Sequence, residues 1–347
     1  MNLYLDERRI RHLLFPFTHI RNVADIRVGI LTIREKWEIL LREDHPVITT
    51  EHPLSDSIIV PANIIPTKDN YRQILSSAKK EEEWSVTEDI KYIDHPWNIF
   101  QFNDWALRKD FELLTHNRKS STIPDIVHCV NKKDIFIEEG AIIHFSSLNA
   151  EAGPVYIGKN TLIMEGALIR GPFSLGEKSV VKMGAKIYGA TTTGVHCVLG
   201  GEIKNSVFFD YSNKAHDGYL GDSVIGSWCN LAAGTTNSNV KNNSSEVYFS
   251  SPSGKSSVSA GTKAGLLMGD YSKTSVNTAF HTGSVVGICS NVFGNVVPDK
   301  HIPNFSWGSE RYHSDKLIRD IGNWKKMKQK EITQEEINMI NTLYNQL

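Results

Sequence analysis

The second half of the sequence repeats with a period of six residues. From Ile157 onward a large side chain recurs at every sixth position: Ile157, Ile163, Ile169, Leu175, Val181, Ile187, Thr193 and Leu199. The positions four residues further on are mostly small: Thr161, Ala167, Ser179, Ala185, Thr191 and Cys197. This period fits neither the 3.6 residues of a helical turn nor plain alternation in a long strand. It predicts a parallel β-helix in which three hexads make one triangular coil.

The repeat has two interruptions, which we interpret as loops that leave the wall of the β-helix. The first, "NSVFFDYSNKAHDG" at 205–218, places Lys214, His216 and Asp217 close together. The second, at 237–265, is rich in serine, glycine and asparagine. Loops that leave a rigid scaffold often display binding groups.

Composition shifts along the chain predict four parts. Residues 1–95 mix apolar runs with helical stretches and indicate a small α/β domain. Aromatic and aliphatic residues at helical spacing predict a linker helix within 96–122, and the repeats place the β-helix at 123–310. The tail at 311–347 is charged and helical, with "TQEE" at 333–336 as a candidate capping box.

Charge and cysteine content exclude several classes of protein. The net charge of −1 and the pI near 6.9 give no basic footprint for nucleic acid or for an anionic membrane. The N-terminus lacks the apolar run of a signal peptide and no segment approaches a membrane span, so we expect a cytoplasmic protein. The four cysteines lie far apart and are expected to be small buried side chains, with no metal site among them.

The segment "KAHDGYLGDSVIGSWCNLAAGTTNSN" at 214–239 resembles the acetyltransferase segment of GlmU-like bifunctional enzymes. These enzymes join a glucosamine-1-phosphate N-acetyltransferase to an N-acetylglucosamine-1-phosphate uridyltransferase. The resemblance implies a left-handed β-helix, acetyl-CoA as co-substrate, an amino-sugar phosphate as acceptor and a homotrimer. It also implies the following roles: His216 and Asn239 catalytic, Tyr219 and Asn230 on the sugar, Lys204 of "GGEIKN" on its phosphate, and Ala233 at the acyl oxygen.

The implied role of His216 agrees with the chemistry of acyl transfer. An amine attacks a thioester only when it is neutral, so a base that titrates near neutrality is needed to take its proton. Amide donors must also meet the oxyanion that develops on the acyl group. The sequence departs from the family pattern in four places. The spacing from the alanine to His216 is one residue shorter, Val240 replaces a tyrosine, Asn205 replaces a second lysine, and the polar loop that follows is longer.

The N-terminal part resembles a divergent nucleotidyltransferase domain through "LFPFT" and "VGILTIREKW". The glycine-rich loop that usually holds nucleotide phosphates is replaced by "DERRIRH". Nearby arginines are the candidate nucleotide-binding residues: Arg8, Arg9, Arg11 and Arg21. The domain is short, so UTP and Mg²⁺ are expected partners only if it has kept its activity.

Four functional hypotheses follow from these observations. The leading one is a sugar-phosphate N-acyltransferase, and a second adds uridylyl transfer to give UDP-N-acetylglucosamine. A third is a non-catalytic sugar-nucleotide-binding or scaffolding protein. A zinc-dependent hydratase is a fourth, and would require His196, His216 and His281 to converge.

Overall fold

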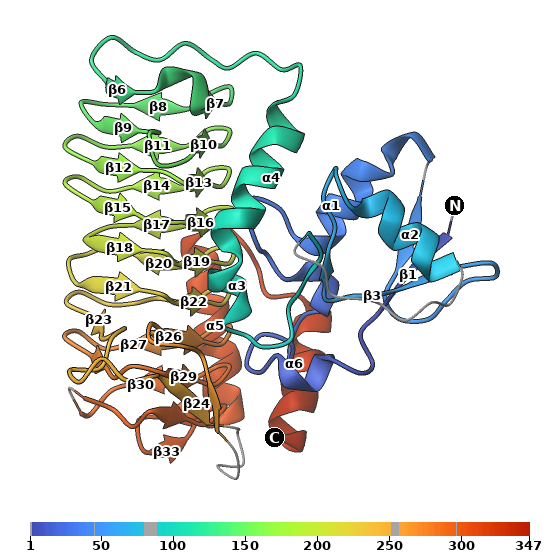
Figure 1. The fold of residues 1–347 in the computed structure, drawn as a ribbon. Helices are drawn as coiled ribbons and strands as arrows, with labels where there is room; N and C mark the ends of the chain where they lie inside the picture. The colour runs from blue at the N-terminus through green and yellow to red at the C-terminus, as the bar shows by residue number, and fades with distance from the viewer. Residues whose placement is uncertain (1, 45, 80–88, 251–256, 296) are drawn as a thin grey trace.

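The hexads form a parallel β-helix with three faces (Figure 1), in a computed structural model that describes residues 2–44, 46–79, 89–250, 257–295 and 297–347. Face 1 is a nine-stranded parallel sheet of β7 (Ile135–Ile137), β10 (Val155–Ile157), β13 (Phe173–Leu175), β16 (Thr191–Thr193), β19 (Val207–Phe208), β22 (Val224–Ile225), β26 (Leu266–Met268), β29 (Ser284–Val286) and β31 (His301–Ile302).

Face 2 consists of β8 (Ile142–Ile143), β11 (Leu162–Ile163), β14 (Val180–Val181), β17 (Val198–Leu199), β20 (Asn213–Lys214), β27 (Lys273–Thr274), β30 (Asn291–Val292), β32 (Ser306–Trp307) and β33 (Glu310–Arg311). Face 3 consists of β6 (His128–Val130), β9 (Ser147–Asn149), β12 (Leu168–Arg170), β15 (Lys186–Tyr188), β18 (Glu202–Lys204), β21 (Tyr219–Gly221), β23 (Thr236–Asn237) and β28 (Ala279–Phe280). The chain passes from face 1 to face 2 to face 3 in each coil. We name the three edges corner 1–2, corner 2–3 and corner 3–1.

The hexad pattern explains why these short strands stack. The aliphatic residues that recur every six positions are buried and form one continuous cluster inside the prism. The small residues, such as Ala167, Ala185 and Cys197, are buried at the corners, where the wall turns. The predicted fold class, a left-handed β-helix of hexapeptide repeats after a small α/β domain and before a C-terminal helix, is confirmed.

The N-terminal α/β domain is built on the parallel strands β2 (Val47–Thr49), β1 (Asn2–Asp6) and β3 (Ile58–Pro61). Its other elements are α1 (Ile33–Leu40), α2 (Tyr71–Lys79), the antiparallel pair β4 (Ile64–Ile65) and β5 (Lys91–Tyr92), and the helices α3 (Asn98–Gln101) and α4 (Asn103–Thr115). Short 3₁₀ helices lie at Arg11–Leu13, Val23–Asp25, Arg42–Asp44 and Lys132–Asp134. A capping box between Thr32 and Glu35 starts α1.

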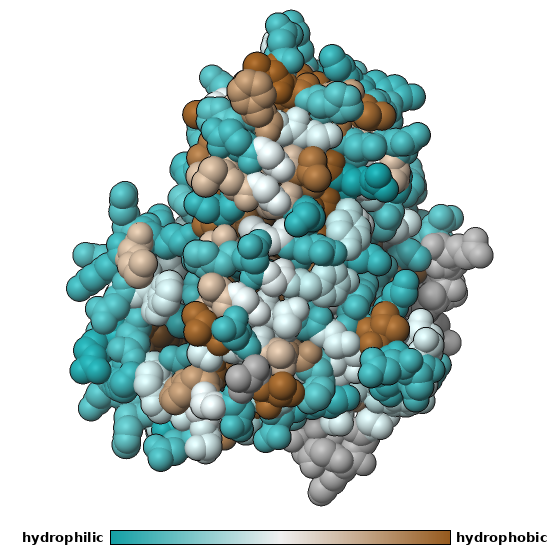
Figure 2. Space-filling model, turned by 90° about the vertical axis from the view of Figure 1, so that its left-hand side faces the viewer, coloured by the Kyte–Doolittle hydropathy of each residue, from teal (hydrophilic) through white to brown (hydrophobic). Residues whose placement is uncertain are grey.

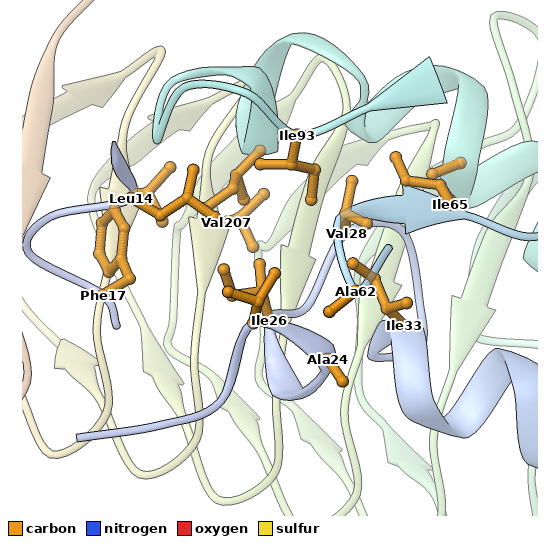
Figure 3. Close-up of a cluster of buried hydrophobic side chains, with 14 of the residues drawn as sticks. Leu14, Phe17, Ala24, Ile26, Val28, Ile33, Ala62, Ile65, Ile93 and Val207 are labelled. Atoms are coloured by element: carbon orange, nitrogen blue, oxygen red, sulfur yellow. The ribbon is translucent and has the colours of Figure 1, made fainter. Parts of the chain in front are cut away.

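This domain packs against the outer side of face 1. Side chains from both parts belong to one hydrophobic cluster (Figure 3), in which Val207 and Phe209 of the β-helix join Phe17 and Ile26. The rings of Phe17 and Phe209 meet edge to face with centroids 5.5 Å apart. Because the two parts share a buried core, the β-helix and the domain before it form one folded unit.

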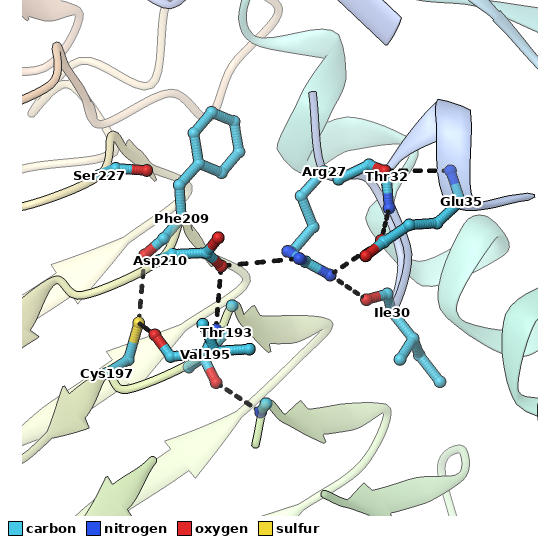
Figure 4. A network of polar contacts seen from close by, with 12 residues as sticks. Arg27, Ile30, Thr32, Glu35, Thr193, Val195, Cys197, Phe209, Asp210 and Ser227 are labelled. Carbon is cyan, nitrogen blue, oxygen red and sulfur yellow. Dashed lines mark hydrogen bonds and ion pairs between the residues drawn. The ribbon is translucent and has the colours of Figure 1, made fainter. Parts of the chain in front are cut away.

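A charged network lies beside this core. The Arg27 guanidinium is 3.6 Å from the Asp210 carboxylate of the β-helix and 3.7 Å from Glu35 of its own domain (Figure 4). Arg21 forms a second ion pair, with the buried Asp270 carboxylate, and its guanidinium lies 4.4 Å above the Phe209 ring. These contacts fix the N-terminal domain to face 1 in one orientation.

The C-terminal tail forms α5 (Ser314–Met327) and α6 (Gln334–Gln346), which cover corner 1–2. Rings stack along this corner from coil to coil, with Tyr211 and Trp228 centroids 4.2 Å apart. The Lys325 amine lies 5.1 Å from the centre of the Trp228 ring and pairs with Glu336. The predicted capping box at 333–336 is confirmed, because the Thr333 side chain accepts from the Glu336 amide and the Glu336 side chain accepts from the Thr333 amide.

The two interruptions differ in structure. The first was wrongly predicted to leave the wall, because β19 and β20 keep it in the sheets of faces 1 and 2. The second leaves at corner 3–1 and forms the antiparallel strands β24 (Tyr248–Ser250) and β25 (Ser257–Ser259), while its residues 251–256 lie outside the described residues. The domain limits given above remain predictions. Within the described part of the chain, no helix has the length and apolar character to cross a membrane.

We predict that the buried ion pair between Lys36 of α1 and Asp110 of α4 is essential for the stability of the N-terminal domain. Asp110 also accepts hydrogen bonds from the backbone amides of Ile30 and Leu31, at 2.8 and 3.1 Å. Asp110→Ala leaves the Lys36 ammonium buried without a partner, because both side chains are almost completely inaccessible. We expect a loss of about 3–5 kcal/mol in the free energy of unfolding, measured by denaturant titration.

The matched control is Lys109→Ala, which removes the exposed ion pair of the neighbouring helical residue with Asp69. Exposed pairs contribute about 0–1 kcal/mol, so this variant should unfold almost as the parent protein does. Equal losses for the two variants would contradict the assignment.

Candidate functional site

Corner 2–3 carries His216. The residue lies between β20 and β21, and Met183, Ala233 and Val276 occupy the corresponding turn of other coils. His216 is exposed, and so are Met183 and Val276. The imidazole is therefore accessible from solvent at the corner that neither the N-terminal domain nor the C-terminal helices cover. Figure 2 shows the side of the prism turned away from the N-terminal domain, with hydrophobic side chains among polar ones over the first coils at the top.

Face 3 presents a row of polar side chains next to this corner. Tyr219 follows the corner directly and is paired in register with Glu202, while Lys204 lies on the same strand as Glu202. The Tyr188 hydroxyl donates a hydrogen bond of 2.5 Å to Glu202, which raises the pKa of Tyr188 to about 12. The Lys204 amine lies 5.8 Å from the centre of the Tyr188 ring and makes no ion pair with the described residues.

Asp222 connects the predicted site residues at the far side of face 3. This buried carboxylate accepts one hydrogen bond from the Asn205 amide at 2.6 Å and another from the Asn239 amide. Burial, followed by the Asp222 charge, raises the pKa of Tyr219 above its ordinary value. The Asn239 side chain is therefore held at the edge of face 3 by its hydrogen bond to Asp222. The sequence motif did not indicate Asp222 as a site residue.

Gly221 allows Tyr219 to lie flat on face 3. A Cβ at residue 221 would lie 2.3 Å from the Tyr219 hydroxyl oxygen and 2.6 Å from the adjacent ring carbon. Any other residue at this position would push the ring away from the sheet. The glycine thus lets the Tyr219 ring lie along face 3 toward Asp222.

The two remaining predicted site residues lie one coil further along. Ala233 lies at corner 2–3, and its carbonyl accepts from the Asn277 amide at 2.7 Å. Within the described residues, nothing accepts a hydrogen bond from the Ala233 amide itself. Asn230 lies on the adjoining face 2, between Asn213 and Lys273. The structure places His216 and Ala233 at corner 2–3, Tyr219 and Lys204 on the adjoining face 3, and Asn239 at corner 3–1 on the far side of that face.

The arginines predicted to bind a nucleotide lie in the N-terminal domain, which packs on face 1 and not at corner 2–3. Arg8 pairs with Asp6 at 2.7 Å, Arg11 pairs with Glu7, and Arg21 pairs with Asp270. Arg9 is exposed. Three of the four guanidinium groups therefore already have carboxylate partners in this structure.

Histidines do not gather into a metal site in the described ranges. His196 lies at corner 1–2, where its ring stacks on Tyr211 with centroids 4.9 Å apart, whereas His216 lies at corner 2–3. His281 follows β28 at corner 3–1. Among the residues that the structure describes, no three His, Cys, Asp or Glu side chains form a group that could hold a metal ion. The convergence that the hydratase hypothesis requires is not seen.

Comparisons with known proteins agree with the two resemblances in the sequence. The family model of sugar nucleotidyl transferases matches residues 2–86 and 59–119. The "Bifunctional protein GlmU" of Methanococcus maripaludis is 25% identical over 272 residues, covering 74% of this chain and 56% of that protein. The "Bifunctional sugar-1-phosphate nucleotidylyltransferase/acetyltransferase" of Sulfurisphaera tokodaii is 30% identical over 210 residues, covering 60% of this chain and 46% of that protein.

These matches confirm the predicted resemblance to GlmU-like proteins. The chain spans about half the length of these curated relatives. Among solved structures, the polySia specific acetyltransferase NeuO matches with a TM-score of 0.31 and 11% identity, covering 58% of this chain and 96% of that one. A similarity of this size carries no functional argument.

We predict that Asp222 holds Asn205 and Asn239 in place at corner 3–1. Asp222→Ala removes two hydrogen bonds to a buried carboxylate and leaves both amides without their acceptor. Hydrogen bonds to charged groups contribute about 1.5–3 kcal/mol, so the free energy of unfolding should fall by at least that amount. Denaturant titration measures the loss.

Asp217→Ala serves as the control, because Asp217 is exposed and its side chain makes no hydrogen bond or ion pair with the described residues. We expect this variant to keep the parent stability. An equal loss of stability in Asp217→Ala would contradict the prediction, because it would show that removing any acidic residue from this part of the β-helix destabilises the protein.

Proposed function

We propose that corner 2–3 is the active site of a sugar-phosphate N-acetyltransferase that moves an acetyl group from acetyl-CoA to an amino-sugar phosphate such as glucosamine 1-phosphate. The observation that carries the proposal is the placement of His216 at exposed corner 2–3, together with an Ala233 amide that has no acceptor among the described residues, and with Tyr219 on the strand that follows the corner. The names of the curated relatives support the acetyl donor and the class of acceptor.

Each residue has a role in the proposed reaction. His216 takes a proton as the amine nitrogen of the sugar forms its bond to the thioester carbonyl carbon. The Ala233 amide donates a hydrogen bond to the oxyanion that forms on this carbon. The carbon–sulfur bond then breaks, and the CoA thiolate leaves with the proton that His216 carried. The products are the N-acetylated sugar phosphate and CoA.

Face 3 supplies the proposed binding groups for the acceptor. Lys204, which lacks a carboxylate partner in the described structure, would meet the phosphate, and the Tyr219 ring would lie against the sugar. Asn239, held by Asp222, would approach from the adjacent coil. Asn230 faces the neighbouring sheet and would contact the sugar only at the edge of this site.

A homotrimer would complete the site. Phe145, Met183 and Val276 lie at the turns of corner 2–3 with 66%, 66% and 63% of their surface exposed. Exposed apolar side chains on both sides of a polar site indicate a contact with another protein surface. A second copy against this corner would cover them and enclose acetyl-CoA between two prisms. Sedimentation velocity measures the assembly, and a monomer at micromolar concentration would contradict this part of the proposal.

A uridylyl-transfer activity of the N-terminal domain is a second candidate, favoured by the match of residues 2–119 to sugar nucleotidyl transferases. This uridylyl transfer is measured as the release of pyrophosphate from UTP in the presence of N-acetylglucosamine 1-phosphate. Mg²⁺ would be needed only for this activity, because no step of the acetyl transfer uses it. The domain remains a candidate binding module if UTP binds without turnover. With acetyl-CoA as the donor, the reaction belongs in the cytoplasm.

We predict that His216→Ala abolishes most of the acetyl transfer. Loss of a general base typically lowers the rate about 10²–10⁴-fold. The measurement is the release of CoA thiol from acetyl-CoA in the presence of glucosamine 1-phosphate. His281→Ala is the matched control, since His281 is also exposed but lies at corner 3–1. Full activity in His216→Ala would refute the proposed base.

A further inference from the structure

Lys214 lies inside the prism at a position where the other coils carry mainly aliphatic side chains. The residues that stack in register with it beneath face 2 are Ile143, Ile163, Val181, Leu199, Leu231, Thr274 and Val292. Lys214 is the charged member of this column, and 0% of its surface is exposed. The hexad pattern therefore places a lysine where packing alone favours leucine or valine.

Among the described residues, the Lys214 amine has only backbone carbonyls as hydrogen-bond acceptors. It donates a hydrogen bond of 2.7 Å to the carbonyl of His216 and lies 3.5 Å from the carbonyl of Gly200. It forms no ion pair with a carboxylate of the described residues. Burial lowers the pKa of Lys214 to about 8, and the Asp217 charge opposes this shift. Burying the ammonium without a carboxylate costs free energy, so the residue does not serve the packing of the prism.

The coil that ends at Lys214 is shorter than the coil before it. Val181 pairs with Leu199, a separation of 18 residues, whereas Leu199 pairs with Lys214, a separation of 15 residues. Only Gly200 and Gly201 cross corner 2–3 between β17 and β18 in this short coil, whereas four residues, 215–218, connect β20 to β21 in the next. The amine of Lys214 bonds to this turn from the inside and holds the peptide group of His216 against the coil above, at Gly200.

We propose that Lys214 is a positioning residue that fixes the backbone of His216, so that the imidazole projects from corner 2–3 in one orientation. This inference rests on the proposed acetyl transfer, since it assigns Lys214 a task in the same site. The lysine would be kept at a cost in stability because it holds the base in place. Catalytic sites commonly contain residues that lower stability in this way.

Lys214→Met tests the proposal, because methionine fills a similar volume without the amine. We expect kcat for acetyl transfer to fall about 10–100-fold with KM for both substrates unchanged, as for a misplaced catalytic group. The melting temperature should stay the same or rise. Leu199→Met is the control at the neighbouring position of the column, and should keep the parent kcat. A kcat within twofold of the parent, or a lower melting temperature with a proportional loss of kcat, would overturn the proposal.

Two further variants separate positioning from packing. Lys214→Gln keeps a donor at this position and should recover part of the kcat that Lys214→Met loses. In the His216→Ala background, Lys214→Met should have no further effect on kcat, because both changes act on the same step. Unfolding of both Lys214 variants, or an equal effect of Lys214→Met in both backgrounds, would assign Lys214 a structural role and contradict the proposal.

Amide hydrogen exchange tests the same point without any assay of activity. In Lys214→Met, exchange at residues 215–218 should become about tenfold faster while the other coils exchange as in the parent protein. Unchanged exchange at this turn would overturn the inference even if acetyl transfer is observed. If the parent protein shows no acetyl transfer but the turn loosens as expected, the proposed function fails while the role of Lys214 in holding His216 stands.

Discussion

The inward packing of one large side chain per hexad holds the coils of the prism at a constant spacing, and the positions of all other groups follow from it. Because the strands are parallel and in register, residues at the same place in each hexad form columns along the prism. Residues at the turns of successive coils therefore lie above one another along each corner. Corner 1–2 becomes a stack of rings beneath the C-terminal helices, whereas corner 2–3 remains exposed and carries His216.

The N-terminal domain depends on the prism for part of its core. Face 1 contributes Val207, Phe209 and Val224 to the cluster that buries Phe17 and Ile26. Two ion pairs, from Arg21 to Asp270 and from Arg27 to Asp210, orient the domain on this face. Arg21, which the sequence suggested for nucleotide phosphates, is therefore used in fixing the fold. This arrangement puts the N-terminal domain and corner 2–3 on different sides of the same β-helix.

The sequence predicted the repeating part of the fold well, because each hexad carries the same packing requirement and an error in one hexad is corrected by the others. It left His216 in an interruption of the repeat, whereas the structure places this residue at a corner within one coil. It did not predict that residues 205–218 stay in the wall, since a coil of 15 residues has no hexad pattern to follow. The sequence drew attention to Lys214 but not to its burial inside the prism, and it gave no sign of Asp222, whose contacts join residues of different coils.

The central claim is that acetyl transfer takes place at corner 2–3. A crystal structure of the protein with CoA bound tests it most directly. Our account predicts CoA along this corner, with its sulfur within about 4 Å of the His216 imidazole and close enough to exchange a proton. CoA bound on face 1 or against the N-terminal domain, with its thiol out of reach of His216, would contradict the account.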